Sequence, residues 1–143
     1  MQNSGMNFNG RVSPVKILVV DDHPHTAALL ARAISQLGTG VEVISATSGY
    51  QALACIQGAP VDILITDMDM PKMTGLELIE KLQAQPTARP TFSFLLTASP
   101  AQRLRIAARC LNVREVLSKP VHPQSVCQIV SKALEEIHQS KII

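Results

Sequence analysis

The residues best suited to chemistry in this sequence stand at the ends of short apolar runs. They are Asp21, Asp22, Asp67, Thr97 and Lys119. Carboxylates are hard oxygen ligands for Mg²⁺, and an aspartate can also act as a nucleophile that accepts a phosphoryl group. A lysine ammonium and a threonine hydroxyl can both bind phosphoryl oxygens. If the five side chains meet in one pocket, they suit phosphoryl transfer to a carboxylate beside a divalent metal.

The apolar runs themselves indicate how these residues could meet. They cover residues 16–20, 61–66, 92–96 and 113–118, and a further strand pattern covers 41–46. Short apolar runs bounded by turn residues and separated by helical patterns are typical of buried parallel strands. Ligands of such sheets bind at the carboxyl ends of the strands, where all five candidate residues stand. The alternation of strands and helices predicts an α/β fold with a doubly wound sheet.

Five helices are predicted between and after the strands, because each start carries a recognisable signal. Proline opens the first and last helices, and capping sequences open the other three; the residues are Pro24, Ser48, Thr74, Ser99 and Pro123. The first helix is expected to end at Gly38 and the second at Gly58. The inward stripe predicted for the first helix consists of Ala27, Leu30, Ile34 and Leu37.

Asp21 and Asp22 are the strongest candidates for metal ligands. Adjacent carboxylates repel each other and are costly to hold together unless a cation lies between them. With Asp67 nearby they would form a cluster of hard oxygens that suits Mg²⁺. The alternative is that the pair only caps the first helix. His23 and His25 follow the pair, and we expect them to be ordinary exposed residues at the helix start rather than ligands.

Length and composition exclude several classes of protein. The 143 residues are 46% hydrophobic, which suits one domain over residues 15–143 after a mobile leader over residues 1–14. No apolar run approaches a membrane span, and residues 1–13 lack a signal core, so we expect a cytoplasmic protein. A net charge of +2 and 3% aromatic residues argue against nucleic-acid binding. The three cysteines are expected to be reduced.

Four motifs, in order, resemble the receiver domain of two-component response regulators. They are Val19-Val20-Asp21-Asp22, Asp67-Met68-Asp69-Met70-Pro71-Lys72-Met73-Thr74-Gly75-Leu76-Glu77, Leu96-Thr97-Ala98 and Ser118-Lys119-Pro120. Each motif alone is a weak signal, but four of them at the right strand ends are specific. The resemblance covers roughly residues 15–137.

The resemblance implies a role for each candidate residue. Asp67 would accept a phosphoryl group from a histidine kinase or phosphotransfer protein, and Thr97 and Lys119 would bind that group. Mg²⁺ would be held by the side chains of Asp22 and Asp67 and the backbone carbonyl of Asp69. Asp21 would hold metal-bound water.

The resemblance also implies an architecture and an output. The sheet would have five parallel strands in the order 2-1-3-4-5, as in flavodoxin-like (βα)5 folds. The domain would signal rather than act as an enzyme on other substrates. Because Thr97 leads into the fourth helix and Lys119 into the fifth, the surface of helix four, strand five and helix five is the expected contact for an output protein or domain.

Two positions depart from the receiver pattern. Val116 stands where receivers usually have an aromatic residue, and Asn112-Val113 replaces the usual Gly-Ala. The rotation of an aromatic side chain should therefore contribute little to signalling. Asp69 could add negative charge beside the phosphoryl group and change its lifetime, or it could be an ordinary solvated loop acid.

Two other functions remain open. Asp67-x-Asp69 resembles the acid pair of haloacid dehalogenase-type phosphatases, but Pro71 occupies the place where that family usually has a hydroxyl residue. A module that keeps the fold and works without phosphorylation is the second alternative. The complete set of acids, threonine and lysine argues against it.

Overall fold

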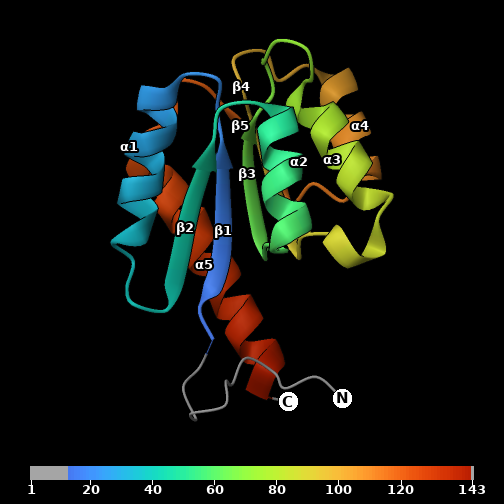
Figure 1. Ribbon diagram of the computed structural model, residues 1–143. Helices are drawn as coiled ribbons and strands as arrows, with labels where there is room; N and C mark the ends of the chain where they lie inside the picture. The colour runs from blue at the N-terminus through green and yellow to red at the C-terminus, as the bar shows by residue number, and fades with distance from the viewer. Residues whose placement is uncertain (1–12, 143) are drawn as a thin grey trace.

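The computed structural model of the chain describes residues 13–142. The predicted leader over residues 1–14 therefore lies almost entirely outside the described residues. The described part forms a single five-stranded sheet whose strand pairs are all parallel, in the order β2-β1-β3-β4-β5 (Figure 1). The predicted fold class and strand order are confirmed. The strands are β1 (Val15–Val20), β2 (Val41–Ala46), β3 (Ile63–Asp67), β4 (Phe92–Thr97) and β5 (Glu115–Ser118).

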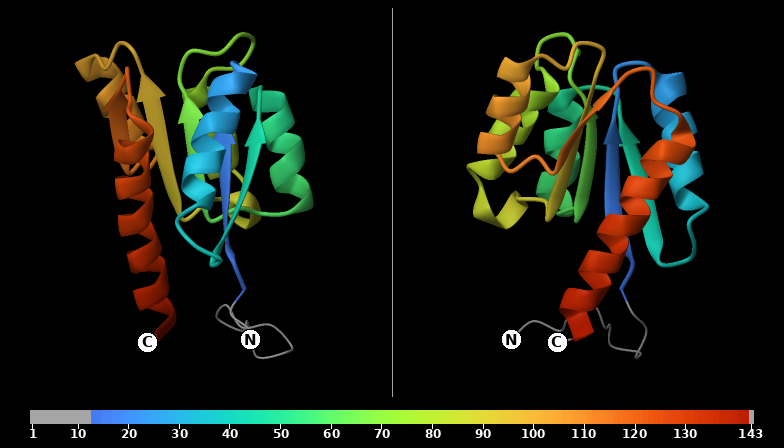
Figure 2. Two further views of the ribbon diagram at one scale, coloured as in Figure 1. Left: turned by 90° about the vertical axis from the view of Figure 1, so that its left-hand side faces the viewer. Right: turned by 180° about the vertical axis from the view of Figure 1, so that it is seen from behind.

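Helices cover both faces of the sheet. They are α1 (Pro24–Ser35), α2 (Gly49–Gly58), α3 (Gly75–Gln83), α4 (Gln102–Cys110) and α5 (Pro123–Ile142), with a short 3₁₀ helix η1 (Pro86–Ala88) before β4. Helices α1 and α5 lie on one face, and α2, α3 and α4 lie on the other (Figures 1 and 2). No helix within residues 13–142 is long and apolar enough to cross a membrane.

The strand residues alternate between two hydrophobic cores. In β1, Ile17 and Val19 pack with α1 and α5, whereas Leu18 and Val20 pack with α2 and α3. Successive side chains of a strand point to opposite faces, so a strand that is buried on both sides needs apolar residues at every position. This requirement explains the unbroken apolar runs, and it leaves the strand ends as the places where polar side chains can gather.

Two predicted helix boundaries are wrong. Helix α1 ends at Ser35 rather than at Gly38, and Leu37 is 37% exposed instead of continuing the inward stripe. Helix α4 begins at Gln102, not at Ser99, and its N-cap residue Ala101 offers no side-chain hydrogen bond. The later start of α4 has a local reason: the Ser99 N–H donates to the Thr97 hydroxyl and the Ser99 carbonyl accepts from the Ala101 N–H, so the chain forms a turn before α4.

The start of α3 packs closely against the end of β3. Thr74 and Glu77 form the predicted capping box, with the Glu77 N–H donating to the Thr74 hydroxyl and the Thr74 N–H donating to the Glu77 carboxylate. The Gly75 N–H donates to the Met68 carbonyl oxygen at 3.0 Å. A methyl group on Gly75 would overlap the carbonyl oxygen of Asp67 and crowd the Leu95 side chain. Only glycine allows this approach of helix and strand end.

We therefore expect Gly75→Ala to lower the free energy of unfolding by about 1–3 kcal/mol, the usual cost of forcing extra volume into a packed region. Urea unfolding followed by circular dichroism measures the change. Gly58→Ala is the matched control, because a methyl group at Gly58 meets nothing within 4 Å; helix propensity should make that variant neutral or slightly stabilising. Equal stability of the two variants would contradict the tight contact.

Candidate functional site

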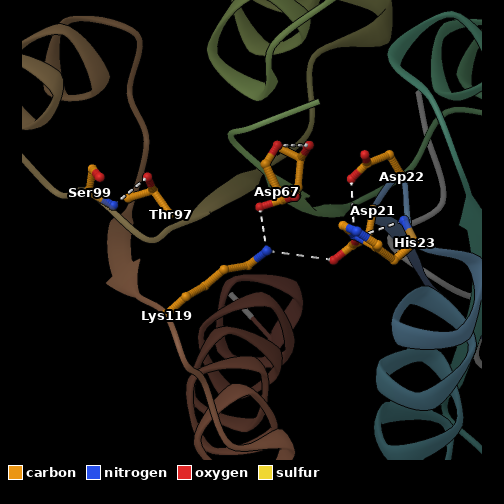
Figure 3. A network of polar contacts seen from close by, with 8 residues as sticks. Asp21, Asp22, His23, Asp67, Thr97, Ser99 and Lys119 are labelled. Carbon is orange, nitrogen blue, oxygen red and sulfur yellow. Dashed lines mark hydrogen bonds and ion pairs between the residues drawn. The ribbon is translucent and has the colours of Figure 1, made fainter. Parts of the chain in front are cut away.

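Three carboxylates lie together at the carboxyl edge of the sheet. Asp21 follows β1 and Asp67 ends β3, and each is only 1% exposed. The side chain of Asp22 is 24% exposed and closes the outer side of the group. Figure 3 shows the three side chains facing a common space above the ends of β1 and β3. Neighbouring parallel strands β1 and β3 place their ends side by side, and this brings residues 46 positions apart into one site.

Lys119 is the cation of the site. Its ammonium nitrogen lies 2.7 Å from Asp67 Oδ1 and 3.9 Å from Asp21 Oδ2. The side chain reaches across from the end of β5, two strands away from β3, and is 28% exposed. The following Lys119–Pro120 peptide bond is cis. Lys119 thus places one positive charge beside the carboxylates of Asp67 and Asp21.

Burial raises the pKa of the Asp67 carboxyl above its ordinary value. Lys119 opposes this shift through its hydrogen bond and its charge, whereas the charges of Asp21 and Asp22 add to it. The net direction is upward because removing a carboxylate from water penalises its ionised form and nearby like charges do the same. The surroundings of Asp67 therefore disfavour its ionised form.

The pKa of Lys119 is also raised above its ordinary value. Burial alone would lower it, but contact with the Asp67 carboxylate and the charges of Asp21 and Asp22 outweigh burial. The ammonium therefore stays protonated throughout the neutral range. It provides a permanent positive charge next to Asp67.

Thr97 lies at the same edge of the sheet but makes a different contact. It ends β4 and is 1% exposed. Its hydroxyl oxygen accepts a hydrogen bond from the Ser99 N–H at 3.1 Å, which ties down the loop that leads to α4. Figure 3 shows Thr97 set apart from the acid and lysine group. The structure thus places Thr97 near the site with its hydroxyl committed to the β4–α4 loop.

The loop after β3 and the histidine after the acid pair also lie close to the site. Asp69 is exposed in the loop after β3, whereas Met70 and Met73 of the same loop are buried against the core. His23 is exposed, as the sequence predicts, and its Nδ1 lies 3.2 Å from Asp21 Oδ1 and 3.3 Å from Asp22 Oδ1. The one signal in the sequence was its position directly after the acid pair at the start of a helix.

The acid group fits a divalent cation. Asp21 Oδ2 is buried and accepts no hydrogen bond from any residue in the described part of the chain. Buried polar atoms are almost always paired, so such an atom indicates a missing partner. Asp22 Oδ1 is in the same condition. Carboxylate oxygens are the ligands that Mg²⁺ prefers, and the partly exposed Asp22 leaves room for the water molecules that Mg²⁺ retains.

Comparison with known proteins agrees with this arrangement. Residues 17–131 match the family model of the response regulator receiver domain. The transcriptional regulatory protein TcrA of Mycobacterium tuberculosis is 37% identical over 111 residues, which cover 78% of this chain and 42% of TcrA. The probable chemotaxis protein CheY of Rhizobium etli is 32% identical over 106 residues, which cover 74% of this chain and 81% of that protein. The chain thus spans less than half the length of TcrA.

A solved structure supports the same relationship. The chemotaxis protein CheY4 of Vibrio cholerae superposes with a TM-score of 0.76 and 27% sequence identity. The superposition covers 84% of this chain and 98% of that one.

The raised pKa of Asp67 predicts how its removal changes stability. A raised folded-state pKa means that the group stabilises the fold fully only below its unfolded pKa, and that this contribution is lost as the pH rises through the folded-state pKa. In the absence of divalent cations, Asp67→Asn should therefore raise the free energy of unfolding at pH 7. The gain should shrink as the pH falls toward 3.8, the ordinary pKa of an aspartate.

Urea unfolding between pH 4 and pH 8 in the presence of a chelator measures this difference. Asp69→Asn is the control, because Asp69 is exposed and should leave the stability nearly unchanged at every pH. A gain for Asp67→Asn that does not vary with pH would refute the electrostatic explanation.

Proposed function

The chain belongs to the response regulator receiver domain family, and we propose that Asp67 is the residue that accepts a phosphoryl group from a phosphohistidine of a sensor histidine kinase or phosphotransfer protein. The observation that carries the proposal is the position of Lys119, whose ammonium lies 2.7 Å from the buried Asp67 carboxylate beside two further acids. Such a group supplies a nucleophile, a cation for the phosphoryl oxygens and ligands for a metal.

The reaction follows from these positions. An Asp67 carboxylate oxygen attacks phosphorus and a P–O bond forms, while the P–N bond breaks and leaves its electron pair on the imidazole nitrogen of the donor histidine. Lys119 stays protonated and attracts the phosphoryl oxygens as a point charge. Mg²⁺ held by Asp22, Asp67 and the Asp69 carbonyl, with Asp21 on its bound water, would neutralise charge on the phosphoryl group. Transfer of this kind depends mainly on positioning and charge neutralisation, which agrees with a rigid site at a sheet edge.

A groove beside the site supports a phosphodonor protein as the partner. It has a volume of about 240 Å³ and runs between α1 and the segment that joins β5 to α5. Leu29, Leu30 and Val121 give it an apolar lining, and Asp21 and Lys119 stand at its margin. Leu29 is 53% exposed and extends this apolar lining to the surface. A helix that carries a phosphohistidine would meet apolar surface and the acceptor together.

The alternatives have less support. A haloacid dehalogenase-type phosphatase would need a leaving-group acid at Asp69, but Asp69 is exposed in a loop and Pro71 follows it. A module that works without phosphorylation would not need a buried acid group with orphaned oxygens. We therefore propose a cytoplasmic phosphoprotein that catalyses only its own phosphorylation and dephosphorylation.

Incubation with acetyl phosphate and Mg²⁺ tests the acceptor directly. One phosphoryl group should be added per chain, and Asp67→Asn should abolish the addition because the nucleophile is gone. Asp69→Asn keeps its backbone carbonyl and should still be labelled, although its rate of dephosphorylation reports whether that side chain affects the lifetime. Intact-mass spectrometry measures both. Labelling of Asp67→Asn at the parent's level would disprove the assignment.

We propose that signalling passes through α4. If the Thr97 side chain moves toward a phosphoryl group on Asp67, its hydroxyl oxygen leaves the Ser99 N–H, which would free the loop before α4. Helix α4 is weakly held, since Ala108 is its only buried residue and its N-cap makes no side-chain hydrogen bond. Val116 provides no aromatic ring to rotate. The proposed output surface is therefore α4, β5 and α5, with α4 moving most.

Beryllofluoride, which mimics the phosphoryl group, tests this output path. Amide resonances of residues 98–109 should shift more than those of residues 50–57 in α2, because only the former follow Thr97 directly. Two-dimensional NMR of the protein with and without beryllofluoride measures the shifts. Thr97→Val, which keeps the size but not the hydroxyl, should reduce the difference; larger shifts in α2 would point to another surface.

A further inference from the structure

We propose that His23 adds a nitrogen ligand to the cation site formed by Asp21 and Asp22, so that this site binds Zn²⁺ or Co²⁺ more tightly than an all-oxygen site would. The inference rests on the cation site of the proposed function, but it concerns which ions that site accepts. It does not depend on phosphorylation of Asp67.

The donor atoms have suitable separations. His23 Nδ1 lies 3.2 Å from Asp21 Oδ1 and 3.3 Å from Asp22 Oδ1. Two ligands bound at about 2.0–2.1 Å in a tetrahedral zinc site are about 3.3 Å apart. One donor from each of the three residues lies within 4.8 Å of the others. An ion could therefore be held with small side-chain movements.

The ion would not have to displace Lys119. The two oxygens of the Asp21 carboxylate face different neighbours: Oδ2 faces the Lys119 ammonium at 3.9 Å, and Oδ1 faces the His23 imidazole. Figure 3 shows Lys119 approaching Asp21 from the β5 side and His23 lying near Asp22. Asp22 Oδ1 accepts no hydrogen bond within residues 13–142, and it lies 3.3 Å from the same imidazole nitrogen.

The chemistry of the donors decides the type of ion. Imidazole nitrogen is a good ligand for Zn²⁺ and Co²⁺, whereas Mg²⁺ prefers oxygen and binds imidazole poorly. Two carboxylates and one imidazole supply three protein ligands, the number that zinc sites with an open position use. Because the same acid pair would hold either ion, Zn²⁺ should compete with Mg²⁺ for it.

Visible absorption spectroscopy of the full chain during titration with Co²⁺ tests the proposal, followed by displacement with Zn²⁺. His23→Gln should weaken Co²⁺ binding by at least about tenfold, the lower end of what loss of even an outer residue costs at a metal site. The same variant should keep its affinity for Mg²⁺ within about twofold, since Mg²⁺ gains little from imidazole. Because His23 is 70% exposed, its replacement should not disturb folding.

Two control variants separate the ligand from general effects. His25→Gln removes another exposed histidine near the start of α1, and it should bind Co²⁺ like the parent. Asp22→Asn should weaken both Co²⁺ and Mg²⁺. During Zn²⁺ titration, the ¹⁵N NMR signal of His23 Nδ1 should shift strongly, whereas the ring of His25 should not.

The outcomes are distinct from those for the acceptor assignment. Equal Co²⁺ affinity of His23→Gln and the parent would overturn the inference, and so would equal losses in the His23 and His25 variants. Either result would leave Asp67 labelling by acetyl phosphate unaffected. Conversely, loss of Co²⁺ binding in His23→Gln together with continued labelling of Asp67→Asn would overturn the proposed acceptor and keep the histidine ligand.

Discussion

The rest of this structure depends on repulsion among three carboxylates, those of the buried Asp21 and Asp67 and of the partly exposed Asp22. Asp21 and Asp67 are almost completely removed from water, and Lys119 is the only ammonium within 4 Å of either of them in the described chain. Burial of like charges opposes folding unless cations are supplied. The side chains of the site therefore destabilise the fold. The surrounding backbone keeps them in place, and burial of the two apolar cores offsets their unfavourable free energy.

The backbone meets this demand with hydrogen bonds that continue past the strand ends. The Met68 N–H donates to the Leu96 carbonyl at 2.7 Å, and the Lys119 N–H donates to the Thr97 carbonyl at 2.7 Å. These bonds fix the positions where the chain leaves β3 and β5. The close approach of Gly75 to the Asp67 carbonyl also fixes the loop between β3 and α3. Rigid positioning of charged groups in this way is what allows them to act on a developing charge without reorganising.

The sequence predicts most of this arrangement because the decisive signals are local. Apolar runs specify buried strands, and strand ends specify where Asp67, Thr97 and Lys119 must stand. The fold class and strand order are confirmed, while the chemical roles of these residues stay predictions. The error at the start of α4 arises because a turn competes with a capping signal. Ser99 has a capping residue type, but its carbonyl oxygen accepts from the Ala101 N–H in a turn, and the first helical hydrogen bond is accepted by Ala101.

His23 shows the other limit of reasoning from sequence. A histidine at a helix start is usually exposed, and this one is indeed exposed. What the sequence cannot indicate is the direction of the side chain. Its backbone N–H donates to Asp21 Oδ1 at 2.9 Å, and the ring turns back toward the same oxygen. Local chain geometry, rather than burial, brings the imidazole to the acids.

The contacts of Lys119 and Thr97 indicate how a phosphoryl group on Asp67 would affect other parts of the domain. In the present state one ammonium, that of Lys119, contacts the Asp67 carboxylate directly, and the Thr97 hydroxyl holds the loop before α4. A phosphoryl group on Asp67 would offer three new oxygens to the same two side chains. The backbones that carry these two side chains are joined, since the Lys119 N–H is bonded to the Thr97 carbonyl. Such a change would therefore act at two neighbouring strand ends, and we propose that α4, which has a single buried residue, responds more than α5.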